Sequence, residues 1–195
     1  MESCLVIIPT YNEIENIHSI IESVLKQGIN FSVLIVDDNS PDGTADLVKV
    51  MQEKESRIHM IQRSGKMGLG TAYIAGFKYG IKHTFDYIFE MDADFSHNPN
   101  DLNRLLNACV KGADMAVGSR YVKGGNIKNW SKDRLLLSYG ASMYVKLITW
   151  LPVNDPTAGF ICYKRKVLES LDLDKIKFIG YTFQIEMKYY AWSKG

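Results

Sequence analysis

The chain has 195 residues, of which 46% are hydrophobic and 23% charged, as is typical of one soluble globular domain. Its formal net charge of +1, without a dense basic stripe, argues against a protein that binds nucleic acid. Three scattered cysteines without a CxxC pair favour reduced thiols over a disulfide framework or a zinc site. No apolar run reaches the roughly 18 residues of a membrane-spanning helix, and the N-terminus lacks the basic region of a signal peptide, so we expect a cytoplasmic protein.

Strand-like apolar runs alternate with helical patterns along the chain. The first run ends at Pro9. Asn12 then precedes apolar residues at helical spacing, so we expect it to cap a helix that ends near Gly28. Further strands are expected at 33–36, 58–61, 87–91, 115–117 and 160–163, and further helices at 44–54, at 71–82 and from Asn98 onward. This alternation predicts an α/β fold, a mainly parallel central sheet flanked by helices, in a single domain.

Polar residues follow several of the expected strands at the point where each strand ends. In a parallel α/β sheet, ligands bind beyond these carboxyl ends. The clusters are residues 9–13, Asp37 with Asp38, residues 92–94, and Ser119 with Arg120. One acidic residue after a strand can be a helix cap or a turn former, which is the interpretation we favour for Asp42 and Asp101. Clusters at successive strand ends predict a ligand site instead.

The segment Asp92-Ala93-Asp94 directly follows an apolar strand, so its two carboxylates leave the sheet edge together. Clustered carboxylates repel one another unless a cation neutralises them, and Mg²⁺ or Mn²⁺ prefers hard oxygen ligands. Such an ion offsets the charge that develops on a departing nucleoside diphosphate. A single DxD is common by chance, but the acidic pair after an earlier strand strengthens this one. We therefore expect a divalent cation and a nucleotide-sugar donor here.

Other residues at this edge suit the remaining parts of a nucleotide. Asp38 could accept a hydrogen bond from a ribose or a base, as acids do in other nucleotide-binding α/β folds. Tyr11 could stack on a base, and Glu13 could accept from it. Arg120 could bind a phosphate through two N–H groups of its planar guanidinium group, although a surface ion pair explains that arginine equally well.

Two familiar patterns are missing from the sequence. The glycine-rich residues 65–70 match neither the GxxxxGK[ST] phosphate loop nor the GxGxxG dinucleotide motif. A strand-to-helix turn with a glycine-assisted cap explains them, although Lys66 could contact a phosphate. The histidines have no metal-ligand spacing, and only His97 lies near the expected site. Neither the GxSxG motif of serine hydrolases, nor the zinc-binding HExxH motif, nor a Cys/His nucleophile arrangement occurs.

Three motifs carry a resemblance to a known family: residues 7–13 (IIPTYNE), 36–44 (VDDNSPDGT) and 91–94 (MDAD). They resemble the family-2 inverting glycosyltransferases of GT-A fold. Within these, the chain is similar to the dolichol-phosphate (polyprenol-phosphate) mannose synthases. That branch is indicated by residues 68–73 (GLGTAY), 95–99 (FSHNP), 118–121 (GSRY), Asn129-Trp130 followed by Arg134, and 155–160 (DPTAGF).

The resemblance implies a role for each residue at the sheet edge. Five residues would line the nucleoside pocket: Pro9, Tyr11, Glu13, Val36 and Asp38. The diphosphate and the metal would bind Asp92, Ala93 and Asp94, with Ser96 as a further metal ligand. Arg120 and Arg134 would bind the phosphates and, with Asp94, form the catalytic set. The implied reaction moves mannose from GDP-mannose to a polyprenyl (dolichyl or undecaprenyl) monophosphate.

This acceptor explains why no catalytic histidine is needed. A phosphate monoester with a second pKa of about 6 is already largely ionised at neutral pH, so its oxygen needs little help from a general base.

A lipid acceptor also requires a membrane-facing surface. Residues 135–151 carry apolar and aromatic side chains at near-helical spacing, which is typical of an interfacial helix and equally of a core helix. We expect peripheral contact with the cytoplasmic face of a membrane.

Relatives of this family continue with a strand and a loop that carries an Arg and a Lys, whereas this chain stops at Gly195. We therefore expect residues 1–195 to be one GT-A catalytic domain that lacks its C-terminal segment.

Three alternatives remain open. The chain could be a related transferase that uses another donor of the UDP-glucose type, a non-catalytic nucleotide-binding domain, or a Rossmann oxidoreductase. The glycine spacing disfavours the oxidoreductase.

Overall fold

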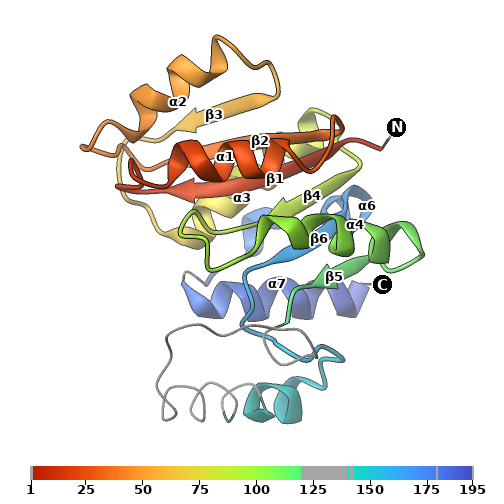
Figure 1. Cartoon of the computed structure of the whole chain (residues 1–195). Helices are drawn as coiled ribbons and strands as arrows, with labels where there is room; N and C mark the ends of the chain where they lie inside the picture. Colours follow the sequence, from red (N-terminus) through yellow and green to blue (C-terminus); the bar gives the residue numbers. More distant parts are fainter. Residues whose placement is uncertain (1, 120–139, 141–142, 179, 195) are drawn as a thin grey trace.

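In the part of the chain that the structure describes, six strands form one sheet that is covered by helices on both faces (Figure 1). The computed structural model describes residues 2–119, 140, 143–178 and 180–194. The strands are β1 (Cys4–Thr10), β2 (Phe31–Asp37), β3 (Ile58–Gln62), β4 (Tyr87–Glu90), β5 (Met115–Val117) and β6 (Ile161–Lys164). The helices are α1 (Ile17–Leu25), α2 (Thr44–Gln52), α3 (Leu69–Lys82), η1 (Pro99–Asp101), α4 (Leu102–Val110), α6 (Arg165–Glu169), η2 (Leu173–Lys175) and α7 (Tyr181–Lys194).

The sheet has the strand order β3-β2-β1-β4-β6-β5. Strands β1, β2, β3 and β4 are parallel to one another, whereas β6 pairs antiparallel with both β4 and β5. The expected α/β architecture with a mainly parallel sheet is therefore confirmed. The reversed direction of β6 was not predicted, because an apolar run of four residues looks the same in either direction. Since β5 opposes β6, it points the same way as β1 to β4.

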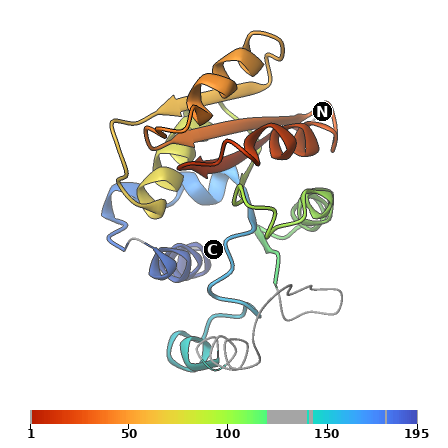
Figure 2. The ribbon, with the colours of Figure 1, turned by 60° about the vertical axis from the view of Figure 1, so that its left-hand side comes forward.

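Two apolar clusters fill the space between the sheet and its helices. On one face α1, α2 and α4 cover side chains of β1 and β2 such as Val6 and Ile35. On the other face α3, α6 and α7 cover the alternate residues, such as Ile7 and Leu34. Figure 2 shows α4 and α7 on opposite sides of the sheet. Burial on both faces explains why these strands are continuously apolar rather than alternating.

The first helix begins later than the sequence indicates. We expected Asn12 to cap it, but α1 begins at Ile17 and Asn12 has a φ of 61°. Three backbone N–H groups of this segment donate to side chains of the loop after β2: Asn12 to Ser40 Oγ at 3.0 Å, Glu13 to Thr44 Oγ1 at 3.1 Å, and Ile14 to Asp42 Oδ2 at 3.0 Å. The amides that a helix N-terminus leaves unpaired are thus satisfied by another loop, and the helix is delayed by one turn.

Helix α3 packs closely on β1 through a glycine. A Cβ atom added to Gly76 would lie 2.6–2.9 Å from three side-chain carbons of the buried Ile7. We expect Gly76→Ala to lower the free energy of unfolding by about 1–2 kcal/mol, because overpacking outweighs the better helix propensity of alanine. Urea unfolding measures this change. Gly65→Ala is the matched control, since no atom lies within 4 Å of its added Cβ, and equal losses in both variants would contradict the packing argument.

Part of the segment 135–151 is described, and it is exposed. Residues 143–149 are helical and lie apart from the sheet in Figure 1 and Figure 2. Its apolar side chains are open to solvent: Met143 57%, Tyr144 66%, Leu147 78%, Ile148 58% and Trp150 80% exposed. The interpretation of this segment as a core helix is therefore wrong for residues 143–150, most of whose apolar side chains are exposed. Within the described ranges, no helix has the length and apolar character needed to cross a bilayer.

Candidate functional site

The polar clusters meet at one edge of the sheet. The register pairs Thr10 with Asp37 at the ends of β1 and β2, and the Met91 N–H donates to the carbonyl of Ile7 at 3.1 Å where β4 ends. Gly118 follows β5 at the same edge, where its N–H donates to the Phe160 carbonyl at 2.7 Å. The sheet therefore brings the loops after β1, β2, β4 and β5 together with the loop that enters β6.

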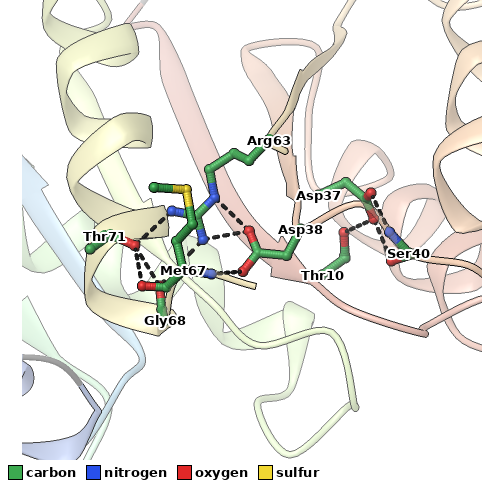
Figure 3. A network of polar contacts seen from close by, with 8 residues as sticks. All are labelled: Thr10, Asp37, Asp38, Ser40, Arg63, Met67, Gly68 and Thr71. Atoms are coloured by element: carbon green, nitrogen blue, oxygen red, sulfur yellow. Dashed lines mark hydrogen bonds and ion pairs between the residues drawn. The ribbon is translucent and has the colours of Figure 1, made fainter. Parts of the chain in front are cut away.

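Asp37 organises the loop after β2. Its side chain is fully buried and accepts hydrogen bonds from Thr10 Oγ1 at 3.0 Å and from both the N–H and the hydroxyl of Ser40 at 2.9 and 2.6 Å (Figure 3). Asp37 thus ties β1 to the loop that carries Ser40. Its role in the structure is to position its neighbours.

Asp38 faces the other way and forms a buried ion pair with Arg63 (Figure 3). The second carboxylate oxygen accepts from the Met67 N–H at 3.2 Å. Arg63 also donates to Thr71 Oγ1 at 2.7 Å and to the Gly68 carbonyl at 3.3 Å. The side chains of the pair are only 9% and 10% exposed, so each charge depends on the other. The pair joins β2, the loop after β3 and the start of α3.

The other residues expected to line the nucleoside pocket differ in exposure and in their partners. Tyr11 is 39% exposed, and Lys66 Nζ lies 4.5 Å from the centroid of its ring, a cation–π contact. Glu13 Oε2 accepts from Asn16 Nδ2 at 3.1 Å. Pro9 is partly buried, whereas the Val36 side chain is fully buried in the core on the α3 face. A nucleoside would therefore meet Tyr11 and Lys66 rather than the Val36 side chain.

Two aromatic residues hold Asp92, one through its carboxylate and the other through its backbone. The buried Tyr73 hydroxyl donates to Asp92 Oδ1 at 3.1 Å, and the Asp92 N–H donates to Nδ1 of His97 at 3.1 Å. The His97 ring stacks on Phe160, with centroids 5.1 Å apart and planes 9° apart. Burial of the segment raises the pKa of Asp92, while His97 and Tyr73 oppose that shift and the Asp94 charge adds to it.

Asp94 and Ser96 face solvent, and their oxygen atoms are of the kind that binds a divalent cation. Asp94 and Ser96 are exposed on one turn, where Asp94 Oδ1 accepts the Ser96 N–H at 2.9 Å, while Ala93 is buried in the core. In the part of the chain that is described, no three or more His, Cys, Asp and Glu side chains are grouped as a metal site. Two carboxylates nevertheless fit Mg²⁺ or Mn²⁺, which complete their coordination with water and substrate phosphates.

Behind this segment lies a buried polar network that the sequence analysis missed. Glu90, the last residue of β4, accepts from Gln184 Nε2 on α7, and Lys188 on α7 is fully buried nearby. Burial raises the pKa of Glu90 to about 7, and the charge of Lys188 opposes the shift. Gln184 and Lys188 share the buried face of α7 with Phe183 and Met187, but Tyr189, Tyr190 and Trp192 are apolar and exposed, so the sequence pattern does not mark that face.

Arg63 was missed as well, although it directly follows β3 at the same carboxyl edge that drew attention to Asp38. Arg120 and Arg134, which we expected to bind phosphates, lie outside the described residues. The structure therefore places the acidic segment and the residues around Asp38 at one edge, and leaves both arginines as predictions from sequence.

A family model described as Glycosyl transferase family 2 matches residues 5–172. The chain is 45% identical over 192 residues to polyprenol monophosphomannose synthase of Mycolicibacterium smegmatis, covering 98% of this chain and 72% of that relative. It is 43% identical over 185 residues to undecaprenyl-phosphate mannosyltransferase of Micrococcus luteus, covering 95% and 76%. It is 38% identical over 179 residues to dolichol-phosphate mannosyltransferase of Pyrococcus furiosus, covering 89% and 49%.

Solved structures show the same fold at low identity. Glucosyl-3-phosphoglycerate synthase from Mycobacterium tuberculosis, in complex with uridine diphosphate, has a TM-score of 0.65 at 18% identity and is matched over 95% of this chain and 64% of that one. A mannosyltransferase from Pyrobaculum calidifontis, in complex with GDP-Man and Mn²⁺, has a TM-score of 0.55 at 21% identity, over 87% and 46%. The chain thus spans less than two thirds of either solved chain. The expected GT-A-like fold is confirmed.

Proposed function

The chain belongs to glycosyl transferase family 2, and on that premise we propose that it is an inverting mannosyltransferase that moves mannose from GDP-mannose to a polyprenyl monophosphate. The observation that carries this proposal is its likeness, along nearly its whole length, to enzymes named for mannosyl transfer to polyprenol, undecaprenyl and dolichol phosphates. The choice of GDP-mannose as donor has weaker support, from a distant structural neighbour.

The sheet edge supports this function through its division into two regions. The Asp38–Arg63 pair and Tyr11 form the nucleoside region, and Asp92 with Asp94 forms the diphosphate region. A divalent cation held by Asp92 and Asp94, with Ser96 as a further ligand, would neutralise the negative charge of the leaving nucleoside diphosphate. Tyr73 and His97 keep Asp92 oriented for this task.

The acceptor needs positioning rather than deprotonation. A polyprenyl phosphate is largely ionised at neutral pH, so its oxygen can attack the anomeric carbon without a general base. Arg120 and Arg134 are the residues we propose for holding the acceptor and donor phosphates, because guanidinium groups bind phosphate oxygens bidentately. Attack on the face opposite the leaving diphosphate inverts the anomeric centre.

A direct assay tests the proposed function. The full chain is incubated with polyprenyl phosphate and Mn²⁺, and with either GDP-mannose or UDP-glucose, and the lipid product is measured. We expect mannosyl lipid from GDP-mannose and no glucosyl lipid. A preference for UDP-glucose would overturn the choice of sugar, and donor binding without any transfer would favour a non-catalytic nucleotide-binding domain.

The exposed residues 143–150 support peripheral contact with a membrane. Met143, Tyr144, Leu147 and Ile148 recur at a spacing that places them on one side of the helix. We expect Leu147→Ser to weaken binding to vesicles of anionic phospholipid about tenfold, because burying one leucine contributes roughly 1.5–3 kcal/mol.

Sedimentation of the protein with vesicles measures this binding. Val50→Ser is the control, since Val50 is also exposed, at 48%, but lies on α2. Unchanged binding of the Leu147 variant, or an equal loss in both variants, would show that residues 143–150 do not form the membrane-binding surface.

A further inference from the structure

Lys188 is a fully buried cation with a specific set of partners. Its ammonium group donates to the carbonyl oxygens of Pro156 at 3.0 Å, Ala158 at 2.7 Å and Gln184 at 3.1 Å. An ammonium group has three protons and can donate to several acceptors at once, and Gln184 Oε1 also lies 3.4 Å from the lysine nitrogen. Buried lysines are rare because desolvating the charge is costly. Here the charge clamps the loop before β6 onto α7.

The clamped loop faces the acidic segment. A methyl group added to Gly159 would lie 3.6 Å from Gln184 Nε2, 3.7 Å from His97 Cε1 and 3.9 Å from Asp92 Oδ2. The next residue, Phe160, stacks on the His97 ring. His97 in turn accepts the backbone N–H of Asp92. An uninterrupted series of contacts therefore runs from Lys188 through the loop and two rings to Asp92.

We propose that Lys188 is a positioning residue: by fixing residues 156–160 it holds the Phe160–His97 stack, and through that stack the backbone and carboxylate of Asp92. Its use in mannosyl transfer rests on the proposed function, since Asp92 serves the cation and the donor diphosphate only there. The positioning itself is a property of the fold and can be measured without substrate.

The competing explanation is that Lys188 only stabilises the core. Its ammonium interacts with Glu90, so removing the lysine leaves a buried carboxyl group without its cation. Lys188→Met would then destabilise the fold, whatever its effect on the site. The double variant Lys188→Met with Glu90→Gln removes both charges and should recover much of the lost stability. It does not restore the bonds to the carbonyls of Pro156 and Ala158.

The experiment compares these two variants with Met187→Ala, which alters the neighbouring, equally buried position of α7. The first readout is the hydrogen exchange of the Asp92 amide in the metal-free full chain, followed by NMR. The second is the affinity for Mn²⁺ alone, measured by electron paramagnetic resonance. Urea unfolding gives the stability of each variant.

We expect faster exchange at Asp92 in both Lys188 variants, and Mn²⁺ binding weakened about tenfold, as for other residues that orient a metal ligand indirectly. In the double variant stability recovers while the Mn²⁺ affinity stays low. Met187→Ala should lose stability without a matching change at Asp92. The proposal is overturned if the Asp92 amide of the Lys188 variants exchanges at the rate found in the unchanged protein. It is also overturned if, across all variants, the exchange rate at Asp92 changes only in proportion to the free energy of unfolding.

These measurements test the positioning role of Lys188 separately from the proposed mannosyl transfer. If the unchanged protein transfers no mannose but Lys188→Met accelerates exchange at Asp92, the positioning stands and the mannosyltransferase assignment fails. If the protein transfers mannose and the Lys188 variants keep normal exchange and Mn²⁺ affinity, only the positioning fails.

Discussion

Asp94→Asn is expected to lower mannosyl transfer roughly 100- to 1,000-fold, because a cation that neutralises the leaving diphosphate supplies several kcal/mol of the transition-state stabilisation. The amide side chain of this variant would keep an oxygen that can accept the Ser96 N–H, so the turn should persist. Asp94 is exposed, and surface substitutions of this kind change stability by less than about 0.5 kcal/mol. The loss should appear in the turnover number at saturating donor and in Mn²⁺ affinity, with an unchanged urea midpoint.

Asp46→Asn is the matched control for this variant. Asp46 is an exposed carboxylate on α2 that pairs with Lys49 at 2.9 Å. Its removal changes the net charge equally and should leave transfer and Mn²⁺ binding intact. An Asp94 variant that keeps full Mn²⁺-dependent activity would show that this carboxylate does not serve the cation.

Asp38→Ala is expected to destabilise the fold by about 3 kcal/mol, since it leaves the Arg63 guanidinium buried without its counter-charge. Arg63→Met should cost a similar amount, and the double variant should lose clearly less than the sum of the two. Urea unfolding of the three variants closes the double-mutant cycle. A purely additive result would mean that the pair does not couple the loops after β2 and β3.

A half-buried pair provides the comparison. Glu55 and Arg57 lie 2.7 Å apart with side chains that are 33% and 23% exposed, and Glu55→Ala should cost less than about 1 kcal/mol. The proposed nucleoside contact adds a second expectation. Asp38→Ala should weaken GDP binding by calorimetry at a temperature where the variant is still folded, whereas Glu55→Ala should not.

Local patterns were enough to predict most of the architecture. The strands, the strand-end clusters and the helix start after Asn98 depend on periodicity and turn chemistry within a few residues. Asn98 indeed accepts the N–H of Asn100 at 3.2 Å before η1. The acidic segment could be found because it follows a buried strand, and its position at the sheet edge follows from parallel topology.

The missed features depend on contacts between distant segments. The cap expected at Asn12 was wrong because Ser40 and Thr44 supply the hydrogen bonds that a helix cap would give. Lys188 looks like a solvent-facing helix residue until the loop at Pro156 and Ala158 is packed against it. Side chains whose partners lie tens of residues away carry no local signal of their role.

The reversed direction of β6 has a consequence for how such a site can be altered. Because β5 and β6 are antiparallel neighbours, β5 ends and β6 begins at the same edge of the sheet, where Gly118 and Phe160 meet. Chain can be inserted or exchanged between these two points without changing strand order or register. Changes between residues 118 and 160 can therefore leave the hydrogen bonds between the loops after β1 and β2 intact.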